Sequence, residues 1–64
     1  MTGVVTEFDD GVGLGTITDD GGTRYPFHCT QIADGTRSIA VGAAVTFDLT
    51  ARLGRYEACD INPR

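Results

Sequence analysis

The side chains that could perform chemistry are few and scattered. His28 is the only histidine of the 64 residues, and the two cysteines are Cys29 and Cys59. A zinc site needs several histidine, cysteine or carboxylate ligands at close spacing, and no such cluster surrounds His28. Cys29 follows His28 directly, but neighbouring side chains of an extended strand point to opposite faces, which argues against a thiolate pair. We therefore predict no metal, no cofactor and two free thiols, as in a reducing compartment.

Two pairs of adjacent acids are the next candidates for chemistry. Asp9-Asp10 and Asp19-Asp20 each precede glycine, a composition typical of tight turns in which aspartate accepts backbone hydrogen bonds. No nucleophile, base and orienting group accompany them, so we interpret them as turn residues rather than acid–base catalysts. The glycine-rich run 11–15 lacks the Lys-Ser/Thr ending of a phosphate-binding loop. The sequence predicts that the protein is not an enzyme.

The charge balance opposes an extended contact with nucleic-acid phosphates. Nine carboxylates against five arginines and no lysine give this acidic protein a net charge of −4. Residues 1–23 contain no basic side chain, so any anion site should use the later arginines, which are too scattered to form a patch: Arg24, Arg37, Arg52, Arg55 and Arg64. The sequence has neither a secretory pattern nor an apolar run of the roughly 20 residues that span a bilayer. We expect a cytoplasmic protein without membrane contact.

Five short segments have the pattern of β-strands, separated by turns rich in glycine and aspartate. They cover residues 3–8, 14–18, 23–28, 43–51 and 56–61. Apolar and polar side chains alternate most regularly over 43–51, which indicates a half-buried strand. Pro26 cannot donate to a ladder and predicts an unpaired side, a bulge or a strand end. Residues 29–41 indicate a long connection with one helical turn around 30–32.

These elements predict an all-β fold, a small five-stranded antiparallel Greek-key barrel. So short a sheet leaves one apolar face and two bare edges unless it closes on itself. A chain of this length has apolar residues for one core only, so we expect 1–64 to form a single domain. We expect ten side chains in the core: Val5, Ile17, Tyr25, Phe27, Ile32, Val45, Phe47, Leu49, Cys59 and Ile61.

With these elements in order, the chain resembles bacterial cold-shock proteins from residue 3 to about residue 61. The first half of the resemblance is carried by Gly3-x-Val5, Phe8, Gly13-x-Gly15-x-Ile17 and Phe27-His28. The second half is carried by Ile32, the loop 35–39, Gly42-x-x-Val45-x-Phe47 and Ala58-x-x-Ile61. The resemblance implies a cold-shock barrel of the OB class, whose outer aromatic and basic side chains bind single-stranded RNA or DNA.

That outer face is altered in this divergent chain. The family's aromatic and basic positions are occupied here by Glu7, Val12, Leu14, Thr16, Pro26, Cys29 and Thr36. Glu7 stands where the family has tryptophan, while Phe8, His28 and the basic loop residue Arg37 persist. Base stacking on an aromatic ring contributes about 1–3 kcal/mol, so three lost platforms remove about 3–9 kcal/mol if the losses add. The resemblance therefore predicts weakened or altered binding.

Two functional hypotheses from different classes follow. In the first, Phe8 and His28 contact bases and Arg37 contacts a phosphate of single-stranded RNA or DNA. In the second, the barrel has lost nucleic-acid binding and serves as a protein–protein interaction module or associates with itself. The face proposed for this second function comprises Val4, Glu7, Val12, Leu14, Thr16 and Pro26. The resemblance favours the first hypothesis, and the local chemistry of the face favours the second.

Overall fold

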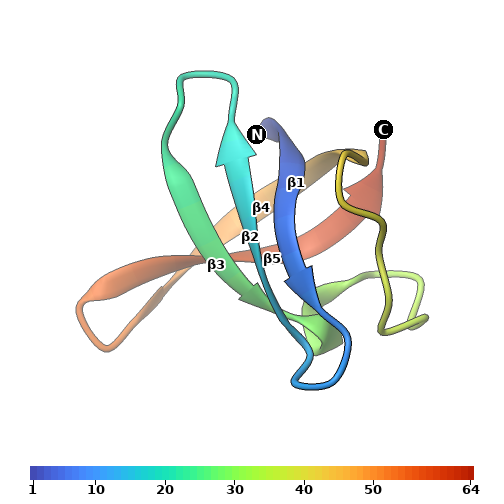
Figure 1. Ribbon diagram of the computed structural model, residues 1–64. Helices are drawn as coiled ribbons and strands as arrows, with labels where there is room; N and C mark the ends of the chain where they lie inside the picture. Colours follow the sequence, from blue (N-terminus) through green and yellow to red (C-terminus); the bar gives the residue numbers. More distant parts are fainter.

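The five predicted strands are all present in the computed structural model, which describes residues 1–64 (Figure 1). The elements are β1 Thr2–Asp9, β2 Leu14–Asp19, β3 Arg24–His28, the 3-10 turn η1 Cys29–Gln31, β4 Ala44–Arg52 and β5 Arg55–Pro63. Every strand pairing is antiparallel, in the order β3-β2-β1-β4-β5. The long connection returns β4 to the side of β1, which is Greek-key topology. The all-β prediction is confirmed.

The two ends of this sheet approach each other and close the barrel. Strands β3 and β5 are in contact, and η1 also lies against β5. Ile32 forms a parallel bridge with Ile61, and the Ala33 N–H donates to the Ile61 carbonyl at 2.8 Å. Pro26 lies on β3, which has only one ladder partner, so its missing N–H is tolerated there. No helix of the chain is long and apolar enough to cross a membrane.

Aspartate and glycine shape the tight turns, as their sequence pattern predicts. Asp9 Oδ1 accepts the Gly11 N–H at 2.9 Å and so holds the β1–β2 turn. Asp19 Oδ1 has the same role in the β2–β3 turn, where it accepts two backbone N–H groups at 2.9 Å each. The β4–β5 turn consists of Leu53 and Gly54, both with positive φ (50° and 82°), as a type I′ hairpin requires.

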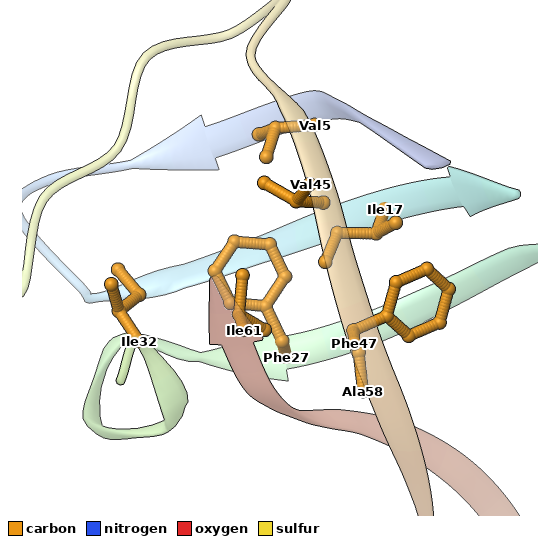
Figure 2. Close-up of a cluster of buried hydrophobic side chains, with 8 residues drawn as sticks. All are labelled: Val5, Ile17, Phe27, Ile32, Val45, Phe47, Ala58 and Ile61. Atoms are coloured by element: carbon orange, nitrogen blue, oxygen red, sulfur yellow. The ribbon is translucent and has the colours of Figure 1, made fainter. Parts of the chain in front are cut away.

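The core lies between the inner faces of the strands and consists of eight buried side chains (Figure 2). They are Val5, Ile17, Phe27, Ile32, Val45, Phe47, Ala58 and Ile61. Seven of these were predicted from the sequence. Two further predicted core residues, Tyr25 and Leu49, are half-buried and pack against the cluster.

The prediction of Cys59 as a core residue is wrong by one position, because β5 contains a bulge. Ala58 is fully buried, while Cys59 is half-buried. The β4–β5 register shifts between Thr46 and Asp48, and Asp60 has φ 49°. An extra residue in one strand breaks the two-residue period, so Ala58 and Ile61 both face inward although they are three apart.

Candidate nucleic-acid interface

The outward side chains of β1, β2 and β3 form three rows, which we call the outer face. From one end to the other, the register pairs Val4 with Thr18 and Arg24, then Glu7 with Thr16 and Pro26, then Asp9 with Leu14 and His28. None of these nine side chains is buried. A bulge at Thr6 shifts the β1–β2 register, and this shift brings Glu7 opposite Thr16 in the central row. The outer face therefore carries mixed charge and only one imidazole ring.

Glu7 and Arg24 form an ion pair that spans β2 on the outer face. Both side chains are exposed, so the pair contributes little to stability. Its effect on the surface charge is larger. Glu7 stands at the tryptophan position implied by the family resemblance, and Arg24 offsets its negative charge. In this arrangement Arg24 is already paired and is not free for a phosphate.

Phe8 pairs with Gly15 of β2, which in turn pairs with Phe27 of β3. The Phe8 ring is therefore directed toward the core rather than fully outward. The Phe8 and Phe27 rings are stacked, with centroids 5.9 Å apart and an angle of 4° between their planes. Gly15 makes room for this stack, because a Cβ there would lie 2.5 Å from Phe27 Cζ. One face of the half-buried Phe8 ring is thus used by the core.

Beside Phe8 the surface is hollowed over a volume of about 280 Å³. This phenylalanine hollow is lined by Glu7, Phe8, Asp9, Leu14, Gly15 and Thr16. Two of its six residues are acids and none is basic. A base could contact the edge of Phe8 here, but the local charge would repel the phosphates attached to that base.

His28 is exposed at the end of β3, and its ring is oriented by the following turn. Its Nδ1 accepts the Thr30 backbone N–H at 3.2 Å and lies 2.9 Å from Thr30 Oγ1. Because Nδ1 acts as an acceptor, the neutral ring carries its proton on Nε2, which is left as a donor. The turn thus presents His28 as a fixed flat ring with one free N–H.

The expectation that Cys29 and His28 point apart is wrong, because the strand ends at His28 and η1 begins at Cys29. Cys29 Sγ lies 3.9 Å from His28 Nδ1, the nitrogen that Thr30 already occupies. The thiol is seated against Gly13, where a Cβ would lie 2.8 Å from Sγ. Both cysteines are free. No group of three histidine, cysteine or acidic side chains is arranged to hold a metal ion.

A second hollow, of about 350 Å³, lies between His28 and the β4–β5 hairpin. This histidine hollow is lined by Leu14, His28, Thr30, Gln31, Thr50, Arg52 and Glu57. Leu14 lines both hollows and forms a ridge between them, with 51% of its surface exposed. Sequence reasoning placed Arg52 near the last hairpin but missed Glu57. Only the fold of the barrel shows that this hairpin faces the end of β3.

Arg37 lies in the long connection, outside both hollows. It is exposed, has φ 58° and takes part in no ion pair. Its neighbours fix the loop. Thr36 donates from its backbone N–H and its hydroxyl to Asp34 at 3.0 and 2.9 Å, and these bonds lower the pKa of the Asp34 carboxyl. Ser38 Oγ donates to Asp10 Oδ1 at 3.3 Å, which ties the loop to the β1–β2 turn.

Comparison with models of known protein families agrees with this barrel. The family model described as the 'Cold-shock' DNA-binding domain matches residues 1–64. The chain belongs to the cold-shock domain family. A cold-shock domain is a nucleic-acid-binding domain, and this membership confirms the resemblance recognised in the sequence. None of the curated proteins compared with the chain matches it.

The apolar residues of this cold-shock domain share the outer face but do not form one patch. Val4 and Leu14 stand in the first and third rows, at opposite ends of the face. Glu7 and Thr16 of the central row lie between them. Val12 lies in the β1–β2 turn and is 61% exposed.

Proposed function

We propose that this cold-shock domain acts as a single domain that binds single-stranded RNA or DNA through an altered, weakened face. The observation that carries the proposal is the exposed His28 ring, held by Thr30 with its Nε2–H free, beside a hollow of about 350 Å³. Bases of single strands are bound by stacking on such rings and by hydrogen bonds to their edges. Phe8 supplies a second, partly covered ring, and Arg37 is an unpaired cation for a phosphate.

The weakening follows from the residues that surround these groups. One face of Phe8 is used by Phe27, Arg24 is paired with Glu7, and the phenylalanine hollow is acidic. A loss of about 3–9 kcal/mol in stacking would turn nanomolar binding into binding between roughly 0.1 µM and a few millimolar, because each 1.4 kcal/mol is a factor of ten. The net charge of −4 reduces the counterion-release contribution as well. We propose that the protein is no enzyme and works in the cytoplasm, where its thiols stay reduced.

The test is a titration of the ¹⁵N-labelled protein with a seven-nucleotide thymidine strand at low salt. Amide shifts near Phe8, His28 and Arg37 should appear and should weaken as salt rises. His28→Ala should weaken binding by roughly five- to 150-fold, the value of one stacking contact. Val41→Ala is the control, since Val41 is exposed and lines neither hollow. Unchanged amide spectra at millimolar strand would refute the proposal.

A protein-interaction module is the second candidate, favoured by the exposure of Val12 and Leu14 on either side of Gly13. Two exposed apolar side chains so close in the chain are a starting point for a contact surface, although single exposed apolar residues are common on monomers. The surface proposed for this role is the set Val4, Glu7, Val12, Leu14, Thr16 and Pro26. Sedimentation velocity should then show a mass that rises with concentration and returns to that of a monomer in Leu14→Asp. A monomer at every concentration would exclude self-association.

A further inference from the structure

The histidine hollow contains one acidic and one basic side chain that do not pair with each other. Glu57 is half-buried and Arg52 is exposed, and both line the hollow. The only ion pair of the chain joins Arg24 to Glu7 elsewhere on the surface. A carboxylate and a guanidinium that line one hollow without an ion pair between them offer it a pair of acceptors beside a fork of donors.

The register of the β4–β5 hairpin places the two charged side chains near each other on one face. Thr50 pairs with Glu57, and Arg52 pairs with Arg55, so Glu57 and Arg52 are diagonal neighbours. Their backbones are therefore about 7–8 Å apart, with both side chains on the same face of the hairpin. The hairpin projects beyond the other strands (Figure 1), and its face carries Thr50, Arg52 and Glu57 to the hollow bordered by His28.

We propose that the histidine hollow selects a guanine base of a single strand, an inference that rests on the proposed function. Guanine is the base with two acceptors, O6 and N7, along one edge and two adjacent donors, N1–H and N2–H₂, along another. The guanidinium of Arg52 donates to O6 and N7, and the carboxylate of Glu57 accepts from N1–H and N2–H₂. The base lies against His28 and Leu14, in a hollow within the volume range of small-ligand sites.

The other bases fit the same pair of charges less well. Thymine and uracil have one imino donor between two carbonyl acceptors, and these carbonyls would be repelled by the carboxylate of Glu57. Adenine and cytosine place an amino donor beside a ring-nitrogen acceptor, so a carboxylate can accept only one hydrogen bond from them without repulsion. A site that makes paired hydrogen bonds to one base rejects bases that leave its groups unpaired.

The test compares five thymidine heptamers whose central nucleotide is guanine, hypoxanthine, adenine, cytosine or thymine, by fluorescence anisotropy of labelled strands at low salt. The guanine heptamer should bind at least roughly tenfold tighter than the adenine, cytosine and thymine heptamers, as a bidentate contact provides. Hypoxanthine keeps N1–H but lacks the N2 amino group, so it should be intermediate. Amide shifts on adding the guanine strand should include Glu57 and Arg52.

Two variants and a matched control locate the recognition. Glu57→Gln cannot accept both guanine hydrogen bonds, so the guanine preference should fall to the part that Arg52 provides, while the thymidine heptamer binds as before or tighter. Arg52→Gln should weaken the guanine heptamer more than the thymidine heptamer. The control is Arg55→Gln, which removes the same charge from the same face of the hairpin at a residue outside the hollow. It should weaken all five heptamers by the same factor.

Each result separates this inference from the function on which it rests. Equal binding of all five heptamers would overturn the guanine site and leave single-strand binding in place. No binding of any heptamer would overturn both. The last measurement adds guanosine 5′-monophosphate or adenosine 5′-monophosphate to the ¹⁵N-labelled protein. If the amide signals of the hollow shift with the guanine nucleotide although no heptamer binds, the hollow binds a free nucleotide, and recognition within a strand is contradicted.

Discussion

At Gly15 the structure leaves no room for a side chain. A Cβ at this position would lie 2.5 and 2.6 Å from two carbons of the Phe27 ring and 2.7 Å from the Glu7 carbonyl oxygen. These neighbours cannot move easily, since Phe27 is fully buried and Glu7 contributes backbone. Overpacking of this kind costs about 1–3 kcal/mol. Gly15→Ala should therefore destabilise the barrel and disturb the stack of Phe8 on Phe27.

The size of this effect is large for so small a protein. At about 0.05–0.15 kcal/mol per residue, the whole chain has a free energy of unfolding of roughly 3–10 kcal/mol. A loss of about 2 kcal/mol lowers the Tm of a domain of this size by about 8–16 °C. Thermal unfolding followed by circular dichroism measures the shift directly. Gly21→Ala is the control, because its Cβ would meet only Asp19 Oδ1, at 3.4 Å, and should change stability by less than about 0.5 kcal/mol.

A double-mutant cycle tests the assigned cause. If the clash with Phe27 is responsible, Phe27→Leu should be less harmful in the Gly15→Ala background than alone, with a coupling of about 0.5–3 kcal/mol. The assigned cause is refuted if Gly15→Ala has the same Tm as the unaltered protein. It is also refuted if the free-energy changes of Gly15→Ala and Phe27→Leu are additive, because Phe27 then does not lie over Gly15.

Three further predictions concern the last hairpin, the outer face and the long connection. Leu53→Asn should raise the free energy of unfolding by about 0.5–1 kcal/mol in chemical denaturation, because Asn-Gly is preferred in the type I′ turn and the Leu53 side chain buries nothing. Thr16→Phe should tighten binding of a thymidine strand by roughly five- to 150-fold in the same titration, by restoring one stacking platform in the central row; no gain would place the strand elsewhere. The lowered pKa of Asp34 means that its contribution to stability is present above the pKa it has in the unfolded chain and is lost as pH falls through its lower folded value. A carbon-detected NMR titration should therefore give Asp34 a midpoint below the ordinary aspartate value, and Thr36→Val should raise it.

The sequence predicts the strands well because alternation and turn chemistry are local. The pattern over 43–51 becomes β4, and the aspartate turns form with the hydrogen bonds expected of them. Alternation fails at Cys59 because a bulge depends on the partner strand, which a single segment does not reveal.

The site is less predictable than the fold for a related reason. His28 and Leu14 were predicted to face outward and do so. Glu57 comes from a distant hairpin and meets His28 only through closure of the barrel. Phe8 was predicted as an outer ring, but its stack on Phe27 depends on the gap left by a glycine in the neighbouring strand. Partners distant in sequence thus determine how much of each side chain is free.

The Leu14 ridge between the two hollows has a consequence for the shape of any strand that occupies both. Such a strand has to separate a pair of neighbouring bases and pass the leucine side chain between them. Tracts of purines resist this, because their bases pile on one another and make the strand stiff. An isolated purine flanked by pyrimidines bends at little cost and can seat its neighbours on opposite sides of the ridge.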